Sequence, residues 1–248
     1  MTIISLASKI FFRELKSGQL LLMFLSLSLA VGIVASITFF TDRLDSSLMF
    51  ESKQFLGGDL KFESSTPLDE SVFPEGDYSY TTIYEFGSVL GSDTNFQLAS
   101  IKSVSSPYPL VGEIEIQDSN GKKIIKKNPP ISGKVWLDAR LASLLEVAVG
   151  EIVNIGEKNF SVSGIILSES DRGAGSFAFA PKAIMNSADL EEANVIQPGS
   201  RVRYSYTFLS SIETIKTLET FFQSIKKPGD DIETPNNEAS PLGRAIKR

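Results

Sequence analysis

The longest apolar stretch of the chain lies near its N-terminus. No residue in 17–41 is charged, and its centre, 19–40, reads QLLLMFLSLSLAVGIVASITFF. As an α-helix, a stretch of about 22 residues spans roughly 33 Å, enough to cross a hydrocarbon layer of about 30 Å. Phe39 and Phe40 stand where a signal peptidase requires small side chains, and globular helices are rarely apolar on every face. The pattern therefore predicts a transmembrane helix over 17–41.

Charged residues on the two sides of this segment indicate its orientation. Lys9, Arg13 and Lys16 precede it together with one acidic residue, whereas Asp42 begins a run of mixed charge. Because basic residues collect on the cytoplasmic side of membrane helices, we expect the N-terminus in the cytoplasm and the chain from Asp42 onward outside. The apolar residues of 1–16 recur near helical spacing, which predicts a short cytoplasmic amphipathic helix on the inner membrane face; a plain extension of the span is the alternative.

Helical spacing continues past the membrane segment. Leu44, Leu48 and Phe55 recur at helical intervals, and the pair at 57–58 is Gly-Gly. Glycine accepts the left-handed conformation that commonly ends a helix. The span is therefore expected to continue as a helical stalk to about Leu56.

Beyond the stalk, the chain alternates between strand and helix patterns. Period-two alternation and turn residues predict hairpins at 91–94, 120–121 and 156–159. Three helices are predicted from their start signals. Asp138 as an N-cap precedes a helix over 138–145, Pro181 as a first-turn residue begins one over 181–193, and a capping box over 210–213 begins one over 212–225. This order of elements predicts an α+β fold.

The outer part is expected to form one domain over 42–240. Its parent unit covers about 42–108 and 200–227, and a β-rich subdomain over about 109–199 is inserted between these halves. Residues 241–248 have the pattern of the start of a further, truncated segment. The predicted fold is therefore one N-terminal transmembrane helix followed by an α+β domain with a β-rich insertion.

Composition removes several kinds of chemistry. The chain has no Cys and no His, and its formal net charge is −6. Thiol nucleophiles, Ser-His-Asp triads and ordinary zinc sites are therefore absent, and the acidic balance argues against nucleic-acid binding. Four lysines over 122–127 flank two isoleucines, a pattern more typical of a solvated strand face than of a ligand patch. We expect no cofactor and no metal.

The run 169–181, ESDRGAGSFAFAP, combines a Gly-x-Gly loop with an acid–arginine pair. A phosphate-binding P-loop would need a Gly-Lys-Ser/Thr ending, which is missing after Gly175. A dinucleotide fingerprint would need a third glycine where Ala178 stands. The loop is therefore not expected to bind a nucleotide.

Catalysis by this loop would need a burial-shifted pKa on Asp171, and no pattern in the sequence shows one. We interpret Gly173 and Gly175 as residues that let the backbone turn tightly, with Asp171 or Arg172 holding the loop in place. No catalytic residue is expected in the chain.

Several runs carry a resemblance to a known family. QFLGGDL follows the first helix, and DRGAGSF, PKAIMNSADL and IQPGSRVRY lie further along the chain. With these runs the chain resembles the FtsX/MacB/LolC-type ABC transporter permeases, and within them the YbbP-like branch. The resemblance covers nearly all of this chain, but only the first third or so of a full permease.

The resemblance implies a MacB-like periplasmic domain behind one helix in the bacterial inner membrane. It implies that the chain is the N-terminal part of a permease subunit, coupled to a separate cytoplasmic ATPase and serving extraction or export of lipid-like or hydrophobic substrates. Membrane lipid would surround the helix, and the YbbP-like branch adds a periplasmic esterase or lysophospholipase as a partner. The alternative is a single-span anchored binding or scaffold module without transport activity.

The same comparison marks candidate structural or transmission residues. They are Gly57, Gly58, Asp59, Asp171, Arg172, Gly173 and Gly175. Whether the Asp171–Gly175 loop contacts a partner stays open at this point.

Overall fold

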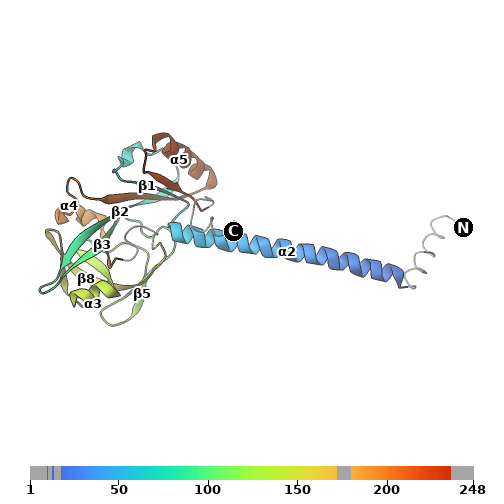
Figure 1. The fold of residues 1–248 in the computed structure, drawn as a ribbon, viewed down its shortest axis with the longest axis horizontal. Helices are drawn as coiled ribbons and strands as arrows, with labels where there is room; N and C mark the ends of the chain where they lie inside the picture. Colours follow the sequence, from blue (N-terminus) through green and yellow to red (C-terminus); the bar gives the residue numbers. More distant parts are fainter. Residues whose placement is uncertain (1–9, 11–12, 14–17, 172–179, 236–248) are drawn as a thin grey trace. The chain divides into compact units, whose positions relative to one another are not determined.

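The computed structural model describes residues 10, 13, 18–171 and 180–235 (Figure 1). Contacts divide the chain after Phe50 into two units, and each is described by itself. The predicted amphipathic helix over 1–16, apart from residues 10 and 13, and the predicted start of a further segment at 241–248 lie outside the described residues.

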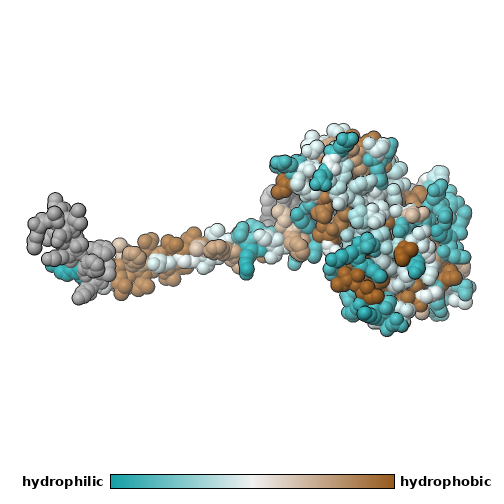
Figure 2. All heavy atoms as spheres, turned by 180° about the vertical axis from the view of Figure 1, so that it is seen from behind, coloured by the Kyte–Doolittle hydropathy of each residue, from teal (hydrophilic) through white to brown (hydrophobic). Residues whose placement is uncertain are grey.

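Helix α2 runs from Gln19 to Leu56 without interruption. It is long and apolar enough to cross a membrane, and Figure 2 shows its exposed apolar side chains in brown. The helix ends as predicted: Gly57 has a φ of 79°, and the N–H groups of Gly57 and Gly58 donate to the carbonyl of Lys53 at 2.9 and 3.1 Å. The predicted stalk to Leu56 is confirmed.

The second unit is built on one large sheet. Its strands are β1 (Leu60–Ser64), β2 (Tyr78–Gly91), β3 (Phe96–Val104), β4 (Ile114–Gln117), β5 (Lys123–Lys126), β6 (Lys134–Asp138), β7 (Ile152–Ile155), β8 (Lys158–Glu169), β9 (Lys182–Asn186), β10 (Val202–Ser210) and β11 (Asp231–Glu233). The helices are α3 (Ala139–Leu145), α4 (Leu190–Ala193) and α5 (Ile212–Ile225), with 3-10 turns η1 (Glu70–Val72) and η2 (Ser187–Asp189). The predicted α+β fold is confirmed.

Part of this sheet closes into a barrel. The strand order is β11-β1-β10-β2-β3-β9-β6-β8-β4-β5, and β7 pairs with both β2 and β8. Strands β2, β3, β9, β6, β8 and β7 therefore form a closed ring. Side chains alternate across its wall: on β6, Val135 and Leu137 belong to the interior cluster and Trp136 to an outer one. Leu141 and Leu145 of α3 join the interior cluster.

The strands that extend from the barrel carry an aromatic core. Phe62 of β1 and Phe208 of β10 pack with Phe222 of α5 and with Phe73, which follows η1. The rings of Phe62 and Phe222 stack with centroids 4.6 Å apart. Phe73 meets the rings of Tyr206, Phe208 and Phe222 edge-on. Helix α5 thus covers one face of the sheet with aromatic contacts (Figure 1).

Two local predictions are corrected. The segment 182–186 is strand β9 and not the beginning of a helix behind Pro181; only η2 and α4 are helical there. Its inner residues are buried on both faces, so periodicity cannot distinguish strand from helix. Helix α5 is capped by Ser211, whose side chain accepts from the N–H of Thr214, and not by Ser210.

Strands of the predicted parent unit pair directly with strands of the predicted insertion. β3 lies beside β9, and β2 beside β7. The boundaries proposed for a parent unit over 42–108 and 200–227 and an insertion over 109–199 stay a prediction about folding units.

Candidate functional site

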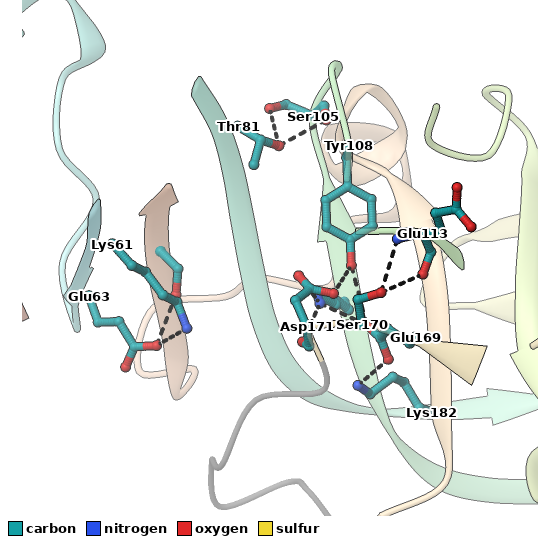
Figure 3. Close-up of polar contacts among 12 residues, drawn as sticks. Lys61, Glu63, Thr81, Ser105, Tyr108, Glu113, Glu169, Ser170, Asp171 and Lys182 are labelled. Atoms are coloured by element: carbon teal, nitrogen blue, oxygen red, sulfur yellow. Dashed lines mark hydrogen bonds and ion pairs between the residues drawn. The ribbon is translucent and has the colours of Figure 1, made fainter. Parts of the chain in front are cut away.

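A cluster of buried charged side chains lies on the outer face of the barrel. Lys102 comes from β3 and Lys182 from the neighbouring β9, while Glu169 ends β8 and Asp171 follows it. Tyr108 reaches the cluster from the loop after β3 (Figure 3). Lys102 points away from the barrel interior, because the residue before it belongs to the interior cluster and side chains alternate along a strand.

Hydrogen bonds join these five side chains. The Nζ atom of Lys102 donates to Oε1 of Glu169 at 2.7 Å and to Oδ2 of Asp171 at 2.9 Å. Lys182 donates to Oε2 of Glu169 at 2.7 Å. The Tyr108 hydroxyl lies 2.9 Å from Oδ1 of Asp171 and 3.2 Å from Oε1 of Glu169, and its one proton serves one of them at a time. Every carboxylate oxygen of the cluster therefore has a donor.

The cluster is both buried and balanced in charge. Lys102 is 2% exposed and Tyr108 is 1% exposed. Two lysines face two carboxylates. Burial of an ion is costly, and mutual attraction offsets that cost only when geometry and hydrogen bonds are complete, as they are here. Removing one member would leave an uncompensated buried charge.

The pKa values follow from burial and from the neighbouring charges. Burial alone would lower the pKa of Lys102, but the carboxylates of Asp171 and Glu169 outweigh it and hold that pKa well above its usual range. Burial would raise the pKa of Glu169, but Lys102 and Lys182 lower it to about 2. For Asp171, burial dominates and raises the pKa, although Lys102 opposes it. Lys102 is therefore charged at neutral pH.

The end of helix α2 lies against this cluster. A Cβ atom added at Gly57 would lie 3.5 Å from the Cβ of Asp171. The structure thus brings together two candidates that the sequence placed more than a hundred residues apart. Asp171 also begins the Gly-x-Gly loop; the other candidates of that loop, Arg172, Gly173 and Gly175, lie outside the described residues.

Gly58 and Asp59 attach the same helix end to strand β10. A Cβ atom at Gly58 would lie 2.7 Å from the carbonyl oxygen of Phe208, so the two backbones approach too closely for any side chain. The Asp59 N–H donates to the same carbonyl at 2.8 Å. The Asp59 carboxylate pairs with Lys53 in the last turn of α2 and accepts from the N–H of Ser210. Helix α2 is therefore held at its end by backbone and side-chain contacts.

Four members of the cluster were not among the predicted candidates: Lys102, Tyr108, Glu169 and Lys182. Lys102 gives a partial signal, because it interrupts the apolar and small residues of LASIKSV within a strand pattern. A lysine in such a position needs a buried partner. No local pattern indicates which carboxylate that partner is.

The arrangement favours positioning over chemistry. Both carboxylates of the cluster accept from lysines, so neither is an unpaired base. In the parts of the chain that the structure describes, no group of three or more His, Cys, Asp or Glu side chains lies together as metal ligands would. The cluster links strands β3 and β9 to the end of β8 through side-chain hydrogen bonds.

A sequence comparison finds a similar protein with a described role. Over 241 residues, or 96% of its length, the chain is 29% identical to a protein of Escherichia coli (strain K12) described as the uncharacterized ABC transporter permease YbbP. The chain spans about 29% of that protein's length. No protein-family profile matches the chain. The resemblance to ABC transporter permeases is confirmed.

Two solved structures align with most of this chain. The periplasmic region of MacB from Actinobacillus actinomycetemcomitans aligns with a TM-score of 0.48 at 12% identity, covering 79% of this chain and 96% of that one. The extracellular domain of the noncanonical ABC-type transporter YknZ from Gram-positive bacteria aligns with a TM-score of 0.45 at 12% identity, covering 71% and 100%.

Proposed function

We propose that this chain is part of an ABC transporter permease subunit of the bacterial inner membrane. The observation that carries the proposal is the match to a permease over 96% of the chain. Helix α2 has the length and composition of a membrane span. The basic residues before it favour a cytoplasmic N-terminus and a periplasmic barrel domain.

In this proposal helix α2 carries movement between the membrane and the domain. The helix is continuous to Leu56. In its last turns Ser52 donates to the carbonyl of Pro235, and Gly57 after it lies near Asp171. A rigid helix whose end is hydrogen-bonded to the domain transmits a displacement better than a flexible linker does. Gly57, Gly58, Asp59 and Asp171 act as positioning residues, and we assign the same role to Arg172, Gly173 and Gly175.

The energy source and the cargo lie outside this chain. A cytoplasmic ATPase subunit hydrolyses ATP, and the permease couples that cycle to extraction or export of lipid-like or hydrophobic substrates. A periplasmic esterase or lysophospholipase is the second partner proposed from the resemblance, and in this proposal the hydrolytic steps belong to the partners. The competing proposal is a single-span anchored binding or scaffold module.

A pull-down tests this proposal directly. The full-length product of the gene, tagged at Met1, is extracted from membranes in a mild detergent, and the copurified proteins are identified. Recovery of an ATP-binding subunit supports the transporter. Recovery of no ATPase, under conditions that keep another ABC complex of the same membrane intact, would favour the single-span module.

A further inference from the structure

A groove of about 810 Å³ lies beside edge strand β5 on the outside of the barrel. Its lining combines Trp136 of β6 and Ser163 of β8 with the end of β5, the loop that follows it and Glu113. Trp136 is only 3% exposed, so the groove reaches the wall of the barrel. A groove of this volume has room for an inserted segment of a partner.

The rim of the groove is basic, although the chain as a whole is acidic. Lys126, Lys127 and Lys134 line it, with Glu113 as the acidic residue among the lining side chains. Within the described ranges no ion pair joins any of these three lysines to a carboxylate. The formal net charge of the chain is −6. The groove is therefore a local positive site that complements an acidic partner.

The groove also offers apolar side chains and an open strand edge. Ile131 is 70% exposed and Ile125 is 54% exposed, so both side chains are free to pack against a bound segment. Strand β5 is the last strand in the sheet order and pairs with β4 alone among the described strands. Lysines at an edge strand ordinarily discourage pairing with other chains. Here they adjoin a cavity with exposed isoleucines, which a purely protective role does not require.

We propose that this groove binds an extended segment of a partner protein, in which acidic and apolar residues alternate, by adding it as a strand to β5. The backbone of the segment would pair with the free edge of β5, its carboxylates would meet the three lysines, and its apolar residues would cover Ile125 and Ile131. An edge strand presents backbone groups that a peptide satisfies and a lipid headgroup does not. This inference does not depend on the chain being a permease.

The groove shares a wall with the buried charge cluster. Glu113 lines the groove, its N–H donates to Oγ of Ser170 at 3.0 Å, and its carbonyl accepts from the same hydroxyl at 2.9 Å. Ser170 lies between Glu169 and Asp171 in the chain, as Figure 3 shows. A segment bound in the groove would therefore contact the strand that holds the cluster in place.

The test uses the full chain in an uncharged detergent and a labelled peptide of alternating Glu and Val. Fluorescence anisotropy at low salt is expected to show saturable binding. The triple variant Lys126→Glu, Lys127→Glu, Lys134→Glu should weaken it about tenfold or more. The matched control Lys216→Glu, Lys226→Glu, Lys227→Glu makes the same charge change at exposed lysines of α5 and the turn after it, and should leave binding unchanged. Equal loss in both variants would overturn the proposal.

A second arm separates strand addition from charge alone. The same peptide with N-methyl groups on alternate residues keeps its charge but cannot donate along one edge, and we expect its binding to fall to background. Equal binding of the methylated peptide would contradict strand addition. Binding of vesicles containing anionic lipid, lost in the groove variant and accompanied by no peptide binding, would assign the groove to a membrane surface instead. Concentration-dependent self-association that the groove variant abolishes, again without peptide binding, would assign it to a second copy.

Discussion

Two buried regions of the same domain are built from opposite chemistry. On the β1–β10 side, Phe62, Phe208 and Phe222 pack ring against ring under helix α5. On the outer face of the barrel, Lys102 and its partner carboxylates are equally buried but held by ion pairs. The first region stabilises the fold through burial of apolar area, which needs no fixed geometry. The second gains little net stability and demands one geometry.

Helix α2 ends between these two regions. Gly57 lies near Asp171 of the charge cluster, whereas Gly58 approaches the backbone of Phe208 on the aromatic side. Hydrogen bonds join the helix end to strand β10 and to Pro235, while the charge cluster lies beside Gly57. Substitutions on the cluster side and on the aromatic side should therefore lower the free energy of unfolding by different amounts.

The largest effect is expected from Lys102→Met. This change leaves two buried carboxylates short of a partner and should lower the free energy of unfolding by about 3–5 kcal/mol. Urea unfolding followed by the fluorescence of Trp136, the one tryptophan of the chain and 3% exposed, measures it. The exposed control Lys216→Met should change stability by less than about 0.5 kcal/mol. A loss below about 1 kcal/mol for Lys102→Met would contradict the cluster's role.

Adding Asp171→Asn to that variant sharpens the comparison. The double variant removes one charge of each sign. Its loss of unfolding free energy should therefore be smaller than the sum of the losses in the two single variants, by at least about 1 kcal/mol. Strict additivity would mean that the two side chains do not act together.

Gly58→Ala probes the aromatic side of the helix end. The new methyl group would lie 2.6 Å from Cγ2 of Thr207 and 2.7 Å from the carbonyl oxygen of Phe208. Because a backbone atom cannot move aside as a side chain can, we expect a loss of about 1–3 kcal/mol in the same urea experiment. Unchanged stability would show that the helix end is not seated where the structure places it.

Gly57→Ala probes the cluster side and should cost less. Its Cβ would meet Asp171 at an ordinary contact distance of 3.5 Å, so the cost comes from the φ of 79°. A non-glycine residue in that conformation loses about 1 kcal/mol. If Gly57→Ala destabilised the chain more than Gly58→Ala, the order of the two contacts would be wrong.

The smallest expected effect is the change of stability with pH. Lys102 and Lys182 outweigh burial and lower the pKa of Glu169 from 4.5 to about 2, so its contribution is present above pH 4.5 and is lost as the pH falls toward 2. Asp171, whose pKa is raised by burial, acts in the opposite direction and reduces the net slope. Urea midpoints between pH 5 and pH 3 should therefore fall more steeply for the parent than for Glu169→Gln. A parallel decline would exclude Glu169 as the source.

Local signals predicted most elements and, of the charge cluster, Asp171 alone. The unbroken apolar stretch predicted helix α2, and Gly57 predicted where it ends. Asp138 was predicted to cap α3, and its side chain does accept from the N–H of Leu141. Lys102 and Lys182 both reach Glu169 only because β3 and β9 pair in parallel, a pairing that depends on closure of the barrel. The misassigned helix at 182–186 has the same origin, since a strand buried on both faces shows no period of two.

The central claim is that α2 is one continuous helix from the membrane span to Gly57, which lies near Asp171. The most direct test is the ATP hydrolysis rate of the permease–ATPase complex in lipid nanodiscs, relative to the ATPase alone, for two variants of the stalk. Leu44→Ala with Leu48→Ala keeps a good helix former at both sites and should retain the stimulation, whereas Leu44→Gly with Leu48→Gly weakens the helix by about 2 kcal/mol and should lose it. Full stimulation in the glycine variant would contradict the account.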